Sequence, residues 1–186
     1  MKRSFDILIA LAAGLLLLLP ALLIALAIKL TSAGPVLYWS ERVGRHNRLF
    51  RMPKFRSMYV DAPTVATHLL HDPARWITPL GGFLRVSSLD ELPQLWSVLK
   101  GDMSLVGPRP ALFNQHDLIA LRNELGVDSL RPGLTGWAQI NGRDEIAIPQ
   151  KVALDGYYLR HQSLALDLCI LARTVGKVFQ RDGVAH

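Results

Sequence analysis

Residues 7–28 have the sequence ILIALAAGLLLLLPALLIALAI and contain no charged side chain. As an α-helix this stretch would be about 33 Å long, close to the thickness of the hydrocarbon layer of a bilayer. It is longer than the apolar core of a signal peptide, which has about 7–15 residues. We therefore predict a membrane-inserted helix over residues 1–30 and one folded unit over residues 31–186, because that length suits a single domain.

Pro20 interrupts the apolar stretch. Proline has no N–H and its ring clashes with the preceding turn, so we expect the helix to bend there. Basic residues lie on both sides: Lys2 and Arg3 before the stretch, Lys29 and the cluster at 42–56 after it. Basic residues beside a membrane helix favour the cytoplasmic side. A bent helix that enters and leaves the membrane by its cytoplasmic face would keep both basic ends on that side. A spanning helix with a proline kink is the alternative.

Composition and charge narrow the class of protein. The 186 residues are 50% hydrophobic with a net charge of only +6, which excludes a disordered chain. A single cysteine excludes intrachain disulfides and any zinc site built on several cysteines. Residues 1–60 hold nine Lys and Arg against two acidic residues, whereas residues 61–186 hold twelve against thirteen. This distribution favours anionic membrane lipid as a partner and argues against nucleic acid.

After the apolar stretch, apolar spacing and turn residues predict a mixed α/β unit that is mostly helical. The segment 164–180 is amphipathic, which suits packing on the core, the favoured interpretation, and also suits an interfacial helix at the membrane surface. The predicted elements are strand-like pieces at 35–39 and 49–50, helices at 89–100, 118–125, 151–161 and 164–180, and a loop at 131–143.

Two adjacent carboxylates, Asp90 and Glu91, fall at the start of a predicted helix in SSLDELP, residues 87–93. Ser88 and Glu91 have the spacing of a capping box, and Asp90 is the alternative cap. An ionised Asp beside a bound phosphate can attack phosphorus, and an adjacent Glu can hold a divalent cation. Acidic residues are also common in a first helical turn, so this segment alone leaves both interpretations open.

Two basic segments carry groups that suit phosphate. Arg109 lies between two prolines, which stiffen its backbone and aim its guanidinium. Lys54 and Arg56 follow the apolar stretch, where lipid phosphate and substrate phosphate are both targets. An ordinary proline turn and a basic membrane-facing patch are the simpler interpretations of these segments.

Residues 131–143, RPGLTGWAQINGR, combine glycines with groups that suit a nucleotide. Glycines allow a ligand to approach the backbone closely, and the segment offers a ring, amides and cations beside them. It matches no established phosphate-loop pattern, and a structured loop without a ligand is the alternative. The candidate nucleotide-binding residues are Arg131, Thr135, Trp137, Gln139, Asn141 and Arg143.

Taken together, these segments resemble the bacterial sugar transferase family, the monotopic polyprenyl-phosphate phosphoglycosyl transferases. The resemblance covers nearly the whole chain, and the length is similar to that of the small members, which consist of the catalytic unit. One departure is that Leu19 precedes Pro20, where some relatives have a serine. The matching pieces are KRSFD at 2–6, KFRSM at 54–58, SLDELPQL at 88–95, LKGDMS at 99–104, VGPRP at 106–110 and residues 131–143.

The resemblance implies transfer of a phospho-sugar, with an N-acetylated amino sugar favoured, from a UDP-sugar to polyprenyl (undecaprenyl) phosphate. UMP leaves, and the polyprenyl-diphosphate sugar is the first membrane intermediate of glycoconjugate synthesis. The resemblance also implies that Asp90 is the nucleophile of a covalent aspartyl intermediate, that Glu91 binds Mg²⁺, and that Arg85 and Arg109 lie near phosphate. It further implies a re-entrant helix and an active site on the cytoplasmic face of the inner membrane.

Two other functions remain open at this point. A membrane-anchored scaffold or lipid-binding protein would use the basic stretch but leaves the aimed Arg109 without a role. An interfacial nucleotide-sugar phosphohydrolase would consume UDP-sugar without a polyprenyl acceptor. A homo-oligomer is compatible with the sequence, which does not determine the oligomeric state.

Overall fold

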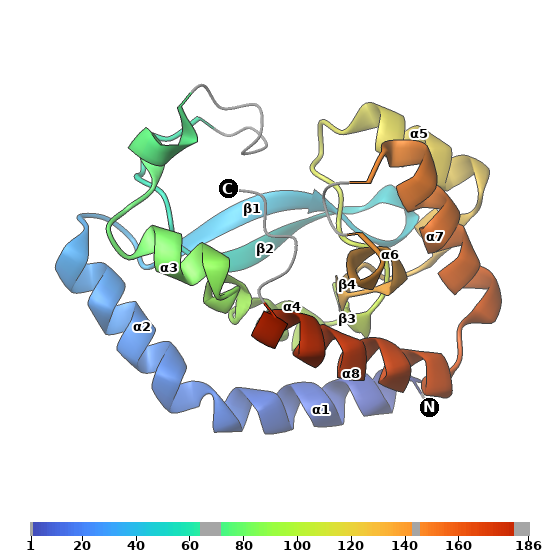
Figure 1. Ribbon diagram of the computed structural model, residues 1–186, viewed down its shortest axis with the longest axis horizontal. Coiled ribbons are helices and arrows are strands. Elements are labelled where there is room, and N and C mark those ends of the chain that lie inside the picture. Colours follow the sequence, from blue (N-terminus) through green and yellow to red (C-terminus); the bar gives the residue numbers. More distant parts are fainter. Residues whose placement is uncertain (1, 64–71, 143–145, 181–186) are drawn as a thin grey trace.

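The computed structural model of the protein describes residues 2–63, 72–142 and 146–180 (Figure 1). The fold is mixed α/β and mostly helical, as predicted. Short 3-10 turns lie at 45–47, 73–76, 89–91 and 127–129. The remaining elements are α1 (Lys2–Leu16), α2 (Leu18–Thr31), β1 (Leu37–Val43), β2 (Leu49–Phe55), α3 (Gly81–Val86), α4 (Gln94–Lys100), β3 (Ser104–Val106), α5 (His116–Glu124), β4 (Gly133–Thr135), α6 (Trp137–Ile140), α7 (Ile148–His161) and α8 (Leu164–Gln180).

The apolar stretch forms two helices, α1 and α2, which meet at Leu17 with a bend of 60°. Pro20 is the third residue of α2, so the predicted bend is confirmed but lies three residues earlier. Proline acts on the carbonyl four residues before it, which is that of Leu16, the last residue of α1. The helical hydrogen bonds on either side survive: Leu17 donates to Ala13 and Ala21 donates to Leu17, each at 2.9 Å.

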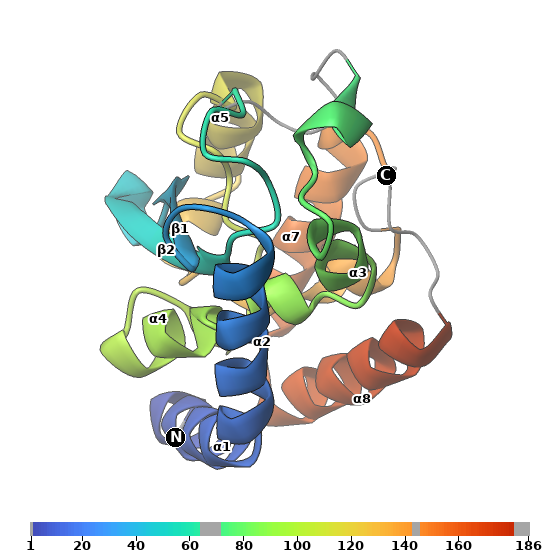
Figure 2. The same ribbon diagram turned by 90° about the vertical axis from the view of Figure 1, so that its left-hand side faces the viewer.

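Leucines along both helices face away from the rest of the molecule. Leu15, Leu16 and Leu30 are 75%, 79% and 76% exposed, so this face is not part of the core. Figure 1 shows the two helices along one edge of the molecule, and in Figure 2 α2 crosses the face turned toward the viewer with α1 below it. Within the described ranges, no single helix combines the length and apolar character needed to cross a membrane, whereas α1 and α2 meet that requirement only as a bent pair.

Charged residues at the start of α1 attach it to the folded unit. The ammonium of Lys2 lies 2.7 Å from a carboxylate oxygen of buried Asp167 in α8. Arg3 donates to two carbonyls at the C-terminal end of α4, at 2.6 and 2.9 Å, where cations are favoured. Asp6, only 2% exposed, accepts a hydrogen bond of 2.8 Å from the hydroxyl of Ser104 in β3. The polar residues ahead of the apolar stretch therefore hold α1 against α4, β3 and α8.

β1 and β2 form an antiparallel hairpin whose register runs from Leu37 opposite Phe55 to Val43 opposite Leu49. The predicted strand pieces at 35–39 and 49–50 fall within or beside these strands, which are longer than expected. The hairpin presents its buried side chains to α4, and its second strand ends one residue after Lys54. This placement directs the end of β2 toward the 3-10 turn at 89–91.

The segment 131–143, which we predicted to be a loop, contains a strand and a helix. β4 pairs in parallel with β3, with Ser104 opposite Gly133 and Val106 opposite Thr135, and α6 follows. A Cβ on Gly133 would clash with the backbone of Gly107, so the two strands approach as closely as glycine permits. Two three-residue strands give too little period-two pattern to be seen in a sequence, which explains the wrong prediction.

The predicted helices near 118–125, 151–161 and 164–180 are confirmed as α5, α7 and α8. In α8 the side chains of Asp167 and Ile170 are buried, so the favoured packing on the core is confirmed for that face. The opposite face carries Leu164, Leu168 and Val175, each about half exposed. The main core joins Phe50, Met52, Val98, Met103, Leu105, Val106, Ile140, Tyr158 and Ile170 with Ala10 of α1.

Candidate active site

The predicted helix over 89–100 is divided in two, and this division positions the adjacent carboxylates. Ser88 adopts a left-handed backbone with φ 58°, and the 3-10 turn Leu89–Glu91 follows it. Pro93 then caps α4. Ser88 stands at the N-cap of the turn without a side-chain cap hydrogen bond, so the predicted capping box is not formed. The N-cap of α4 is Pro93, so the alternative prediction of Asp90 as the cap is also wrong. Asp90 and Glu91 therefore lie within a short 3-10 turn and do not cap a helix.

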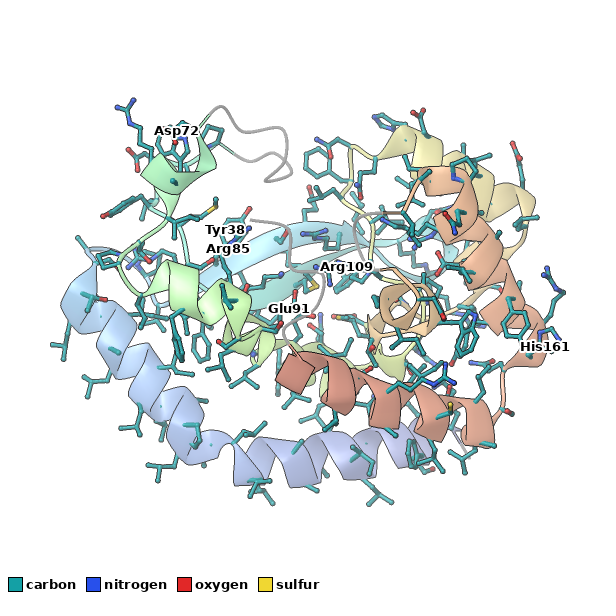
Figure 3. All side chains as sticks on the ribbon, in the orientation of Figure 1. Tyr38, Asp72, Arg85, Glu91, Arg109 and His161 are labelled. Carbon is teal, nitrogen blue, oxygen red and sulfur yellow. The ribbon has the colours of Figure 1, made fainter. Side chains whose placement is uncertain are left out.

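Four charged side chains from three segments meet at this turn. The ammonium of Lys54 lies 2.7 Å from an oxygen of Glu91 and 3.9 Å from an oxygen of Asp90. A terminal nitrogen of Arg109 lies 3.4 Å from the same oxygen of Glu91. We call Lys54, Asp90, Glu91 and Arg109 the carboxylate cluster. Figure 3 shows Glu91 and Arg109 near each other in the middle of the molecule, with His161 at its far edge.

The two carboxyl groups of the cluster experience opposite effects. Burial raises the pKa of Asp90, which is 7% exposed, and the positive charge of Lys54 only partly opposes that rise. Burial acts in the same direction on Glu91, but Lys54 and Arg109 outweigh it and hold the pKa of Glu91 well below its ordinary value. Neighbouring carboxyls whose pKa values are driven apart are typical of sites in which the two groups have different roles.

Arg85 and Arg109, both predicted to lie near phosphate, belong to this region. Arg85 lies in the last turn of α3, and its charge lowers the pKa of Asp90, as that of Arg109 does. Figure 3 labels Arg85 together with Glu91 and Arg109. Lys54, Arg85 and Arg109 therefore all act electrostatically on Asp90.

A buried ion pair that the sequence analysis missed supports Arg109. Arg122 donates to the backbone carbonyl of Arg109 at 2.9 Å and to one carboxylate oxygen of Asp155 at 2.7 and 3.0 Å. Asp155 is 1% exposed. In the sequence, only the position of Asp155 on the same helix face as Val152 and Tyr158 could have indicated that it is buried. Its partner Arg122 is distant in the chain and could not be identified in this way. The pair therefore positions the backbone of the proline-flanked arginine.

Arg56 and Arg131, also candidates, have partners outside the cluster. Arg56 is buried and donates to the carbonyls of Ser32 and Ala33, so it holds the end of α2 against β2. Arg131 donates to the carbonyl of Gly101 at 3.0 Å and lines a different cavity. The structure therefore does not bring these two guanidinium groups together with Asp90.

The other candidates from the segment 131–143 surround α6. The Thr135 hydroxyl pairs with that of Thr174 at 2.7 Å, and Trp137 stacks on Tyr157 with ring centroids 5.3 Å apart. The amide of Asn141 donates to the carbonyl of Trp137 at 2.7 Å. Both amide atoms of Gln139 are buried with no hydrogen-bond partner in the described part of the chain. Arg143 lies outside the described residues.

The residues present fit a magnesium ion only with the help of a ligand. No group of three or more His, Cys, Asp or Glu converges in the described part of the chain. Asp90 and Glu91 are hard oxygen donors, and Mg²⁺ is commonly held by one or two carboxylates plus substrate phosphates and water. The donor set therefore suits Mg²⁺ held jointly by Glu91 and a phosphate-bearing molecule.

Comparisons with known proteins show which sequences this chain is similar to. The family model described as bacterial sugar transferase matches residues 1–181. The chain is 40% identical to a UDP-galactose-lipid carrier transferase of Erwinia amylovora, and the alignment covers 98% of the chain and 41% of that protein. It is 41% identical to the uncharacterized sugar transferase EpsL of Bacillus subtilis, covering 99% of the chain and 90% of that protein.

A further relative is the UDP-N-acetylgalactosamine-undecaprenyl-phosphate N-acetylgalactosaminephosphotransferase of Aeromonas hydrophila. It is 39% identical over 98% of the chain and 44% of its own length. The chain thus spans about two fifths of the length of the relatives from Erwinia and Aeromonas.

Proposed function

Because the chain belongs to the bacterial sugar transferase family, we propose that it transfers a sugar 1-phosphate from a UDP-sugar to polyprenyl phosphate and releases UMP. The observation that carries this proposal is the carboxylate cluster, in which Lys54 and Arg109 contact Glu91 and Lys54 lies 3.9 Å from buried Asp90. Such a site combines a nucleophile for phosphorus with cations that neutralise phosphate oxygens.

In the proposed reaction a carboxylate oxygen of Asp90 attacks the β-phosphorus of the UDP-sugar. The bond from that phosphorus to the bridging oxygen breaks, and the oxygen leaves with UMP. A phosphate oxygen of the polyprenyl phosphate then attacks the same phosphorus, which releases the Asp90 carboxylate and yields the polyprenyl-diphosphate sugar. Two successive displacements allow the water-soluble donor and the lipid acceptor to occupy the site in turn.

The neighbouring side chains have separate roles in this proposal. Lys54, Arg85 and Arg109 bind the phosphate oxygens and stabilise the charge that grows on them. Glu91 stays ionised because Lys54 and Arg109 lower its pKa, so it is available as a metal ligand. Bound there with a substrate phosphate, Mg²⁺ would add positive charge to that already supplied by the cations.

We propose that the uridine part of the donor lies against α6. The unpartnered amide of Gln139 supports this placement, because a buried amide without partners is costly unless a ligand completes its hydrogen bonds. Trp137 begins the same short helix and offers an aromatic ring, and Asn141 follows the end of that helix and offers a side-chain amide. Thr135, Arg131 and Arg56 are not needed for this proposal, because Thr135 pairs with Thr174, Arg131 lines another cavity and Arg56 holds the end of α2.

We propose that α1 and α2 enter and leave one leaflet of the inner membrane from its cytoplasmic face, with residues 31–186 outside the hydrocarbon. Their exposed leucines support insertion, and Lys2 and Lys29, near the two ends of the pair, support a common side. The exposed face of α8, with Leu164, Leu168 and Val175, suits contact with the same membrane surface. An N-acetylated amino sugar is the proposed sugar.

The test is UMP release by the full chain in detergent, with UDP-galactose, UDP-glucose and UDP-linked N-acetylated sugars, with and without polyprenyl phosphate and Mg²⁺. We expect release to require the lipid and Mg²⁺, and Asp90→Asn to abolish it. Asp117→Asn, which removes the same charge from an exposed position, is the matched control. Full multiple-turnover release without lipid would indicate a phosphohydrolase, and no release with any donor would contradict the proposal.

A further inference from the structure

A cavity of about 180 Å³ lies where α1 begins, and basic side chains from distant parts of the chain line it. Lys2 and Arg3 come from the first turn of α1, Arg45 from the turn between β1 and β2, and Arg131 from the segment before β4. Asp6 is the one carboxylate among the described residues of the lining. No member of the carboxylate cluster lines the cavity, so it is separate from the candidate active site.

Arg45 and Arg131 are held in the same way. The Nε of Arg45 donates to the carbonyl of Ser129 at 2.7 Å, and the Nε of Arg131 donates to the carbonyl of Gly101 at 3.0 Å. A guanidinium has five N–H donors, and one of the five is used in each case. The terminal nitrogens of both side chains have no hydrogen-bond or ion-pair partner among residues 2–63, 72–142 and 146–180. Backbone carbonyls thus hold the two side chains while their terminal nitrogens remain available.

The carboxylates nearby do not neutralise these guanidinium groups. Asp6 and Asp167 form ion pairs with Lys2, at 3.8 and 2.7 Å. Arg3 also donates only to carbonyls in its described contacts, those at the end of α4. Three guanidinium groups that line one cavity repel one another, and an anion that accepts their hydrogen bonds removes that repulsion. A phosphate group, with several oxygens in a tetrahedral arrangement, suits donors that converge from different directions.

We propose that this cavity binds a phosphate group, as carried by a membrane glycerophospholipid or by free phosphate. Its place in the fold favours the lipid source. The cavity is at the first turn of α1, and the same helix exposes Leu8, Leu11 and Leu15 farther along. If those leucines contact hydrocarbon, the phosphate layer of the lipid lies at the level of the helix start. The phosphate site itself does not depend on the proposed transfer reaction.

The experiment is a calorimetric titration of the full chain in a neutral detergent, without UDP-sugar or Mg²⁺. The two probes are short-chain phosphatidylglycerol and inorganic phosphate. Arg45→Gln should weaken binding about tenfold, since a hydrogen bond to a charged group is worth about that factor. Arg48→Gln removes the same charge from an exposed position in the same turn that does not line the cavity, so binding should be unchanged.

The outcomes distinguish a lipid headgroup from free phosphate, and the cavity from the carboxylate cluster. Weaker binding of phosphatidylglycerol alone in Arg45→Gln supports the site and identifies a lipid headgroup, and weaker binding of both probes supports a general phosphate site. Weaker binding of inorganic phosphate alone supports a site for the free anion. Equal effects of Arg45→Gln and Arg48→Gln, or binding that disappears only in Lys54→Gln, would overturn the proposal, as would the absence of binding by the parent protein.

Discussion

The buried pair of Arg122 and Asp155 allows a quantitative prediction for the substitution Arg122→Met. Arg122 donates twice to one oxygen of Asp155 and once to the backbone carbonyl of Arg109. Methionine keeps much of the apolar length of the side chain but leaves Asp155, 1% exposed, without its cation. Breaking a buried ion pair by removing one partner costs about 3–5 kcal/mol. At roughly 2–4 °C per kcal/mol for a chain of this size, the midpoint of thermal unfolding should fall by roughly 6–20 °C.

The loss of stability should depend on pH, with a definite sign. Burial raises the pKa of Asp155, and Arg122 opposes that rise. Without Arg122 the folded state holds a proton on Asp155 at pH values where the unfolded state releases it. Stability therefore falls as pH rises from the ordinary value of an aspartic acid to the raised value in the folded state. Arg122→Met should be less destabilised at pH 5 than at pH 7.5.

The assay is thermal and denaturant unfolding in detergent at both pH values, with UMP release measured in parallel. Arg48→Met, at an exposed position, is the control for loss of a positive charge. The double variant Arg122→Met/Asp155→Leu removes both charges and should regain part of the stability, because an apolar pair avoids the unpaired carboxylate. A loss below about 1 kcal/mol for Arg122→Met at pH 7.5, or a double variant less stable than the single one, would refute the reasoning.

Three further predictions use the same protein. Lys54→Met should lower UMP release on the order of 100-fold while unfolding stays cooperative, and a loss below threefold would exclude a role of Lys54 in stabilising charge. On the acidic side of its pH profile, UMP release should fall to half at a pH above the ordinary pKa of an aspartic acid, because burial raises the pKa of Asp90. A midpoint at or below that ordinary value would contradict the assignment of Asp90 as the nucleophile. Gly133→Ala should destabilise the protein by about 2 kcal/mol or more, because the new Cβ would clash with backbone atoms. Gly14→Ala, with open space around it, should be neutral or stabilising by about 0.5–1 kcal/mol. Equal midpoints of thermal unfolding for the two variants would contradict this prediction.

The parts of the fold that could be predicted are those with a strong local pattern. The bent helix pair follows from twenty-two uncharged residues with Pro20 among them, and long helices such as α7 follow from apolar spacing. The adjacent carboxylates Asp90 and Glu91 could be selected as candidates from the sequence because their type and position suit phosphorus chemistry. β3, β4 and α6 could not be predicted, because elements of three or four residues are too short to show a period.

What the sequence by itself determined is the apolar stretch, the uneven charge and the residues suited to phosphate. Only the tertiary structure decided which of those residues act together: Lys54 and Arg109 contact Glu91, whereas Arg56 holds the end of α2 and Arg131 lines another cavity. The physical reason is that a basic side chain has the same local sequence pattern whether it binds a ligand or holds two segments together. The packing of segments that are distant in the chain determines its partner, and the neighbouring residues do not indicate which partner that is.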